Sequence, residues 1–417
     1  MRNSSIALCL AAVLPCGVVS TALAQPAPPV PSSEQADGSS PYSLKNTALQ
    51  PPVLTPQQAA SAPYELSGTN ISGATQTTEV ILTAPIDKKA VAYKTESGVY
   101  LYPTVFMGFG YNDNVRASST DPIGSSLINV VPEVVAEMKH KGDRYTAKAA
   151  LNITRYANSS DDNYSNPSFE LAGDNYFSAR ARTGWSVGQV NGIDPRGATS
   201  RTASSEPDHW HSNNVNGRAI YGAPEAPGRL ELDLGSQAKT YDNNRAFTAV
   251  SDVTVNSLAA RAFYRLGTRT MALVEFRDAK ADYPSSLSTD SNTERRYYGG
   301  LTWEATAATT GIVKVGYMTK DFDLASKSSY SGGSWEATVR WLPQTYSAFD
   351  LTTSRSAVDS TGFGDYTVNT SLNLLWNHQW SQSLTSRASV GVLATDFAGT
   401  NRKDTTNSLA LTVYYAV

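Results

Sequence analysis

The chain ends in a stretch with a two-residue period, Leu409-Ala410-Leu411-Thr412-Val413-Tyr414-Tyr415-Ala416-Val417. In an extended chain, the leucines, Val413, Tyr415 and Val417 share one face. The alternation predicts a β-strand that runs to the last residue. An apolar strand at a free sheet edge promotes aggregation unless another strand pairs with it. The closing strand of a membrane barrel has this pattern, because alternate side chains face lipid and the first strand pairs with the last.

This last stretch resembles the C-terminal signal by which bacterial outer-membrane proteins are recognised for assembly. Tyr415 lies third from the end, and Val417 stands where such proteins usually have an aromatic residue. The resemblance implies that the barrel-assembly machinery is a partner of the chain through its C-terminal strand.

The first residues predict export. Arg2 precedes an apolar run over residues 6–19, and Ala22-Leu23-Ala24 supplies the small residues that a signal peptidase reads. We therefore expect a signal peptide over residues 1–24. A transmembrane helix is disfavoured, because the run is too short to span a bilayer and prolines follow it from Pro26.

The composition excludes several classes of protein. Both cysteines, Cys9 and Cys16, lie in the predicted signal peptide, so the mature chain would have no thiol catalysis, thiolate metal site or disulfide. A net charge of −3 gives no argument for nucleic acid as a partner. After the signal, no apolar run approaches the roughly 18 residues of a membrane helix. A barrel remains allowed, because its apolar residues alternate and dilute the mean hydropathy, which is −0.32.

Residues 25–97 are rich in Pro, Ser and Gln and show little periodicity. We expect a disordered periplasmic segment there, with docking of a partner on the prolines of residues 26–31 as a weaker alternative. Strand-like runs then recur about every 20 residues over residues 98–417, which predicts about 16 strands, in the range 14–18. The expected fold is all-β: a transmembrane antiparallel up-and-down β-barrel in the bacterial outer membrane.

The clearest alternation lies in residues 334–341, where tryptophans and aliphatic residues oppose charged and polar ones. A soluble β-sandwich or β-helix would also alternate, but long strands with aromatic residues near their ends favour the barrel. The candidate interface aromatics are Trp335, Trp341, Trp376 and Tyr415. The candidate lumen-facing residues are Glu133, Glu137, Lys148, Arg229, Glu231, Asp233, Arg261, Arg265, Glu275, Arg277, Glu304, Glu336, Arg340 and Arg387.

Two roles are open for these inward charges. Their mixed signs argue against a strongly anion-selective or cation-selective pore. They would either form cross-strand ion pairs that stiffen the wall or contact what passes through it.

Catalytic chemistry has little support. His209 and His211 would share a strand face as two metal ligands might, but a third ligand is not evident, and a hydrogen-bonding role is favoured. Ser212 follows His211 directly and would point to the opposite face, which disfavours a lipid-modifying enzyme. Residues 192–197 are interpreted as a turn-rich loop instead of a phosphate-binding loop, and the acidic residues 161–163 as a solvated turn instead of a calcium site. We expect no enzyme, cofactor or metal site.

Several short motifs resemble the outer-membrane β-barrel porins encoded with exopolysaccharide biosynthesis systems. They are Tyr111-Asn112-Asp113-Asn114-Val115, Val131-Pro132-Glu133-Val134, Tyr156 with Asp161-Asp162-Asn163-Tyr164, Tyr221-Gly222-Ala223-Pro224, Gly228-Arg229-Leu230-Glu231 and Tyr241-Asp242-Asn243-Asn244. The resemblance covers about residues 99–417. It implies a pore that takes part in exopolysaccharide export, with outer-membrane lipid, polysaccharide and periplasmic export components as partners. A general diffusion porin for small hydrophilic solutes is the alternative.

Overall fold

The computed structural model describes residues 92–116, 121–196, 205–223, 226–306, 309–359, 364–381 and 383–415. The predicted signal peptide and most of residues 25–97 lie outside these ranges. The described chain forms one sheet of 17 strands. They are β1 (Tyr93–Lys94), β2 (Tyr100–Asn112), β3 (Ser125–His140), β4 (Asp143–Tyr156), β5 (Tyr164–Tyr176), β6 (Ala181–Asp194), β7 (Asp208–Tyr221), β8 (Gly228–Tyr241), β9 (Val253–Gly267), β10 (Thr270–Asp282), β11 (Asn292–Thr306), β12 (Thr309–Phe322), β13 (Tyr330–Gln344), β14 (Ser347–Asp359), β15 (Tyr366–Gln379), β16 (Leu384–Phe397) and β17 (Lys403–Tyr415).

Apart from the two-residue β1, the strands are 13 to 16 residues long. At about 3.3 Å per residue, thirteen residues reach about 43 Å, enough for a tilted strand to cross a bilayer. Leaving β1 out of the 17 gives sixteen long strands, which confirms the predicted all-β class and strand number. Among the described residues, helical structure is confined to α1 (Arg245–Thr248) and the 3-10 turns η2 (Ser160–Asp162) and η3 (Ala249–Ser251). None of the described helices has the length and apolarity that a membrane span needs.

Each strand from β2 to β16 pairs antiparallel with the next one in the chain. The connections alternate in length. Residues 141–142, 268–269 and 345–346 are tight turns at the end where β17 finishes, which we call the short-turn end. Residues 242–252 and 283–291 belong to the opposite, long-loop end. Outer-membrane barrels have the same asymmetry, with short periplasmic turns and longer extracellular loops.

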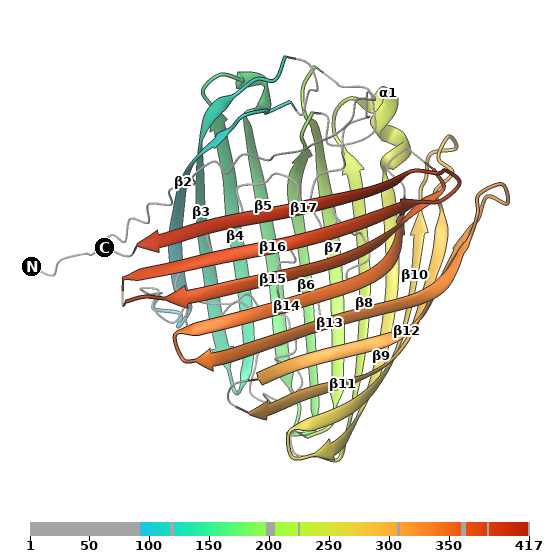
Figure 1. Ribbon diagram of the computed structural model, residues 1–417. Helices are drawn as coiled ribbons and strands as arrows, with labels where there is room; N and C mark the ends of the chain where they lie inside the picture. Colours follow the sequence, from blue (N-terminus) through green and yellow to red (C-terminus); the bar gives the residue numbers. More distant parts are fainter. Residues whose placement is uncertain are drawn as a thin grey trace, which may run out of the picture.

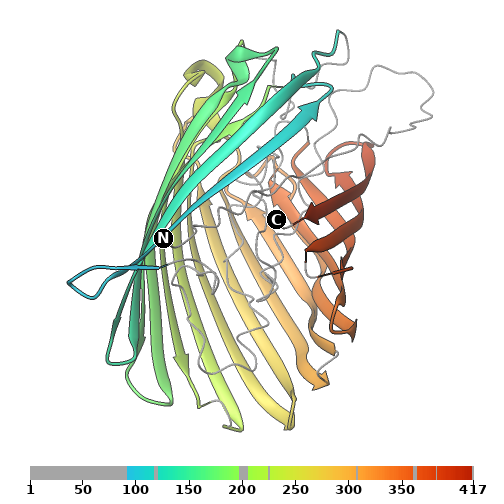
Figure 2. The same cartoon turned by 90° about the vertical axis from the view of Figure 1, so that its left-hand side faces the viewer.

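The sheet curls around a central space, with β3 to β8 forming one side and β13 to β17 crossing in front of them (Figure 1). β17 has a full register with β16, but among the described residues no register joins β17 to β2, and their ribbons stand apart (Figure 2). Unpaired strand edges are unfavourable in hydrocarbon. We therefore expect these two edges to meet when the protein is in a bilayer.

The two faces of the sheet differ in polarity, and β8 shows this most clearly. Leu230, Leu232 and Leu234 are 57%, 40% and 53% exposed, whereas Arg229, Glu231 and Asp233 between them are 6%, 8% and 4% exposed. A soluble sheet would bury the leucines and expose the charges. Apolar residues on the outer face and ion pairs on the inner face suit a barrel surrounded by lipid.

Buried apolar groups form small clusters on the inner face instead of one central core. Phe263, Met271, Leu273 and Ile312 pack together near the short-turn end. Near the long-loop end, Val253 and Val255 of β9 pack with Ala279 and Ala281 of β10, and a third cluster contains Met318, Tyr330, Ala357 and Val368. The space between these ends is lined by polar groups.

Aromatic side chains gather on the outer face of β13 to β16 near the short-turn end. Trp341 stacks on Phe349 with ring centroids 5.4 Å apart, and Phe349 stacks on Trp376 at 6.2 Å. Trp380 adds an edge contact to Trp376 at 6.3 Å. Amphipathic rings at one height suit a bilayer interface. Trp335 lies on the same face of β13, six positions nearer the long-loop end than Trp341; for Tyr415 the structure gives only the backbone register, opposite Leu384.

Candidate functional site in the lumen

The inner face carries a continuous row of charged side chains at mid-height of β7 to β13, which we call the charged belt. Most of these side chains are buried against one another in the wall of the lumen. The belt consists of Arg218, Glu231, Asp233, Arg261, Glu275, Arg277, Arg296, Lys314 and Glu336.

Glu336 on β13 is the centre of the belt over β10 to β13. Its carboxylate accepts two hydrogen bonds from the Arg277 guanidinium, at 2.7 and 2.9 Å. Lys314 Nζ lies 2.5 Å from Oε2, and Arg296 Nη1 lies 3.3 Å from Oε1. Arg277 and Lys314 also pair with Glu275, so the two carboxylates share their cations. A buried charge is tolerated only when it is paired and hydrogen-bonded, and each of these charges is.

The belt continues over β7 to β9, where arginines again pair with carboxylates of the neighbouring strand. Arg218 Nε donates to Asp233 Oδ1 at 2.5 Å, and Arg261 donates to Asp233 Oδ2 at 2.7 Å through Nη1. Arg261 Nε also lies 3.4 Å from Glu231, which pairs with Arg229 at 3.0 Å. Because cations and carboxylates are interspersed along the belt and pair with one another, the belt presents no extended region of a single sign to the lumen.

The inner face of β14 to β17 is different: near mid-height it is polar and uncharged. Thr352 is in register with Asn373, and Ser354 with Ser371, their hydroxyls 2.8 Å apart. The registers continue this face across β16 and β17. We call this surface the polar wall; it comprises Thr352, Ser354, Asn369, Ser371, Asn373, Ser389, Thr406 and Ser408. The lumen therefore has a charged side with internal pairing and a side of mostly hydroxyls and amides, which Leu375 and Leu393 interrupt.

The comparison with protein families agrees with this arrangement. The family described as putative beta-barrel porin 2 matches residues 97–417. The chain belongs to this family. Membership in a porin family points to the outer membrane as the location and makes the lumen of the barrel the candidate functional site.

Three solved structures that resemble the chain at low sequence identity are the following. A "Bacterial polysaccharide outer membrane secretin" is 10% identical over 76% of this chain and 98% of its own, with a TM-score of 0.39. OprD of Pseudomonas aeruginosa is 11% identical over 80% of this chain and 99% of its own, with a TM-score of 0.40. The FrpB iron transporter of Neisseria meningitidis is 10% identical over 76% of this chain and 59% of its own, with a TM-score of 0.45. No curated protein matches.

The sequence-predicted lumen residues lie on the inner face of this porin wherever their side chains are described, with different partners. Glu133 pairs with Lys148 at 2.9 Å, and Glu137 with Arg144 at 2.5 Å. At the short-turn end, Arg265 donates to two turn carbonyls and Arg387 donates to the Asn377 side chain. Arg340 lies 3.8 Å from Asp350, which the sequence analysis did not select. The side chain of Glu304 lies outside the described part.

Three central members of the belt were not among the residues predicted from the sequence to face the lumen: Arg218, Arg296 and Lys314. Each occupies an alternate position of a long strand, so the period-two pattern over residues 208–221, 292–306 and 309–322 was the available signal. Glycines interrupt this alternation. Gly217, Gly299 and Gly311 lie at outward positions of these strands, and Gly316 lies at an inward position of β12, so the pattern was difficult to detect in the sequence. The histidine cluster lies at the start of β7, and His211 Nδ1 lies 2.7 Å from Asp242 Oδ1.

Trp210 and Tyr241 are buried together on the inner face of β6 to β8 near the long-loop end. Trp210, 2% exposed, donates from Nε1 to Asp194 at 3.0 Å, and the hydroxyl of Tyr241 donates to the same carboxylate at 2.6 Å. Lys239 Nζ lies 4.4 Å from the centroid of the Trp210 ring. The ring lies directly against the backbone of Gly192.

Gly192→Ala is expected to destabilise the barrel by about 1–3 kcal/mol, because the new Cβ would lie 2.2 Å from Trp210 Cζ2 and force the ring away from Asp194. Urea unfolding in lipid vesicles measures the loss, and near-ultraviolet circular dichroism reports the displaced indole. Gly217→Ala on β7 is the control, since a Cβ there meets no atom within 4 Å. Equal stability of the two variants would contradict the packing described.

At the same end, Asp365 joins two loops. Its Oδ2 accepts a hydrogen bond from the Ser328 backbone N–H at 3.0 Å. Hydrogen bonds from Ser328 hold the pKa of Asp365 below the usual range of a carboxyl group. For a lowered pKa, the stabilising contact is complete above the ordinary carboxyl pKa of about 4 and is lost as the pH falls through the lowered value.

We therefore expect the Ser328 amide to lose its protection from hydrogen exchange on acidification below about pH 4. Hydrogen exchange, corrected for the intrinsic pH dependence, measures this. In Asp365→Ala the protection should be low at every pH. Protection in the wild type that stays constant down to pH 2 would show that the carboxylate does not hold this loop contact.

Proposed function

We propose that the barrel is a pore that takes part in the export of an exopolysaccharide across the outer membrane. The observation that carries this proposal is the two-sided lumen, in which every belt charge is paired and the opposite wall offers mostly hydroxyls and amides. Sugar hydroxyls both donate and accept hydrogen bonds. A wall of Ser, Thr and Asn side chains matches them with many weak contacts that a moving polymer exchanges one at a time.

The paired belt supports the same function from the other side. Charges engaged with each other in a rigid network have little remaining attraction for a neutral polymer, so the polymer would not be held tightly. A general diffusion porin for small hydrophilic solutes is the second candidate, since it needs the same wide barrel. It would typically place acidic and basic residues on separate sides of a constriction, whereas the belt mixes both signs from strand to strand.

Deletion of the gene in its host, followed by weighing of polysaccharide in the medium and in the periplasm, tests the proposal. We expect less polymer outside and accumulation or envelope stress inside. Complementation with wild type should restore secretion, whereas Asn373→Arg, which places a cation on the polar wall, should restore it only in part. Unchanged secretion in the deletion strain would reject export and favour the nutrient porin, to be tested by uptake of small sugars.

The segment over residues 25–97 enters this proposal as the part that would reach periplasmic export components. Removal of this segment, with the signal peptide retained, should leave the folded barrel in the membrane and reduce secretion. Full secretion by the truncated protein would show that the segment takes no part in export.

A further inference from the structure

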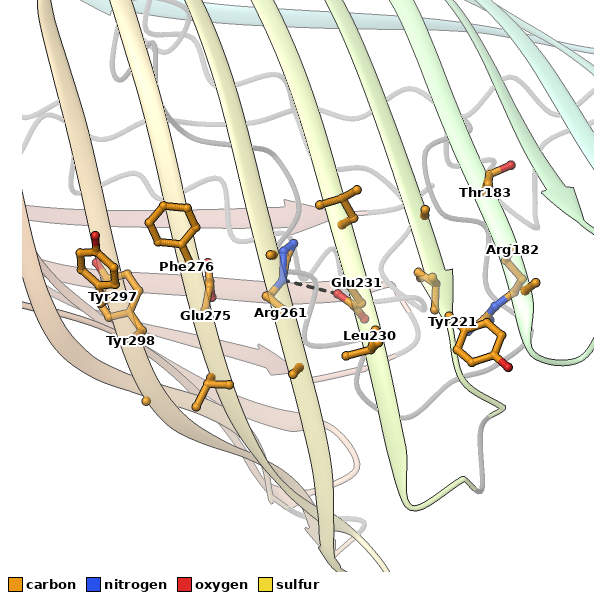
Figure 3. A pocket seen from close by; sticks show the side chains of 18 of the residues that line it. Arg182, Thr183, Tyr221, Leu230, Glu231, Arg261, Glu275, Phe276, Tyr297 and Tyr298 are labelled. Carbon is orange, nitrogen blue, oxygen red and sulfur yellow. Dashed lines mark ion pairs between the residues drawn. The ribbon is translucent and has the colours of Figure 1, made fainter.

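The outer face of the barrel carries a groove of about 960 Å³ that crosses β6 to β11 (Figure 3). Two adjacent rows of cross-strand neighbours form it. The row nearer the short-turn end is Ala181, Tyr221, Leu230, Ala262, Val274 and Gly299, and the next row is Thr183, Ala219, Leu232, Ala260, Phe276 and Tyr297. Twelve outward positions on six strands thus contribute to one depression.

Its shape follows from the sizes of the residues in each row. Ala260 and Ala262 on β9 leave the middle of the groove low, between the leucines of β8 and the Val274 and Phe276 side chains of β10. Figure 3 shows Tyr221, Phe276 and Tyr297 on the outside, whereas Glu231 and Arg261 form their ion pair on the lumen side. The groove is therefore an external, apolar feature that is separate from the lumen.

The surroundings of the groove indicate what fills it. The bounding side chains are well exposed, with Tyr221 at 60%, Val274 at 62% and Tyr297 at 50%, and in a membrane barrel this face meets hydrocarbon. Arg180 is exposed in the turn directly before Ala181, and its carbonyl accepts a hydrogen bond from the Gly222 N–H at 2.7 Å. That contact fixes the turn beside the connection between β7 and β8. Arg180 thus lies in the turn at the short-turn end of the groove, one residue before the lining residue Ala181, near where a lipid phosphate would lie above its acyl chains.

We propose that this groove is a binding site for a phospholipid of the leaflet at the short-turn end. Its acyl chains lie over Ala260 and Ala262, and Arg180 pairs with the phosphate. The inference requires only that the barrel is embedded in a bilayer, so it does not depend on what passes through the lumen. A second copy of the barrel is the other occupant that an apolar outer face accepts.

The double variant Ala260→Leu/Ala262→Leu fills the groove without adding charge, and Arg180→Gln removes only the cation. Ala149→Leu, on the outer face of β4, is the matched control. Each purified protein is titrated in detergent with dioleoyl phosphatidylglycerol, and native mass spectrometry counts the lipid bound. Heat-modifiable migration on gels verifies that each variant is folded.

Wild type and Ala149→Leu should retain one lipid at low lipid concentration, with about tenfold weaker retention in the groove-filling variant. Arg180→Gln should weaken retention of phosphatidylglycerol while leaving the folded barrel unchanged. Equal lipid retention in wild type and the groove-filling variant would overturn the proposal. A dimer in wild type that disappears in the groove-filling variant would also overturn it, by assigning the groove to a second copy of the chain.

Discussion

Replacing Glu336 with Gln is expected to lower the free energy of unfolding by about 3–5 kcal/mol, the largest stability effect in the lumen. The carboxylate contacts Arg277, Lys314 and Arg296, and its removal leaves Arg277 and Lys314 to share Glu275 while Arg296 keeps Glu294. Buried cations without compensation are far less stable than the same cations in a complete network. Unfolding by urea in lipid vesicles, followed by gel migration, measures the change.

Glu133→Gln is the matched control for this prediction. It also removes one inward carboxylate of similar exposure (29%, against 23% for Glu336), but Glu133 pairs with one cation, Lys148, which is 34% exposed. The three cations around Glu336 are only 1–15% exposed in their side chains. An exposed pair contributes about 0–1 kcal/mol, so the control should remain close to the wild type. If the two variants lose similar stability, the belt is not the buried network described above.

Leu372→Arg is expected to destabilise the barrel in a bilayer by about 2–4 kcal/mol, because it places a cation in hydrocarbon near the middle of β15. Leu372 is 48% exposed on the outer face, and the next residue, Asn373, belongs to the polar wall. Asn373→Arg adds the same group to the same strand but directs it into the lumen, where the cost should be small. Unfolding of both variants in vesicles of one lipid composition provides the comparison.

The two arginine variants also differ in what they do to the pore. Asn373→Arg should shift the ion selectivity towards anions, whereas the fraction of Leu372→Arg that inserts should conduct as the wild type does. A large loss of stability in Asn373→Arg together with a neutral Leu372→Arg would show that the faces of β15 are reversed. That result would reverse the assignment of the lumen as well.

The outward and inward faces could be predicted from sequence because the strands are long and the wall of the barrel is a single sheet. Leu230, Leu232 and Leu234 alternate with Arg229, Glu231 and Asp233, and this period survives without knowledge of any partner strand. The same holds for β13. Strand number followed from the length of the chain and the spacing of these runs.

Partners across strands could not be predicted, because they depend on register. Glu336 meets Arg277 from three strands away, and the two residues are 59 positions apart in the sequence. The groove has the same origin, since Ala262 and Val274 become neighbours only through the register of β9 with β10. Trp210 and Gly192 likewise form one packed unit only after β6 and β7 have paired.

The burial of the belt explains how a polar lumen is compatible with a stable barrel. Most of the belt's side chains are less than 9% exposed, because cation and carboxylate side chains cover each other along the wall. The polar wall needs no such pairing, since hydroxyls and amides satisfy each other and water equally well. The charged side thus stabilises the sheet, and the neutral side remains available for what passes through the lumen.

Single-channel recording in planar lipid bilayers tests the central claim, a lumen open across the membrane, most directly. The refolded barrel should produce discrete conductance steps with weak preference between cations and anions, because the belt charges cancel in pairs. Asn373→Arg should change that preference, and Leu372→Arg should not. A protein that inserts and shows heat-modifiable migration but conducts no current would contradict the account.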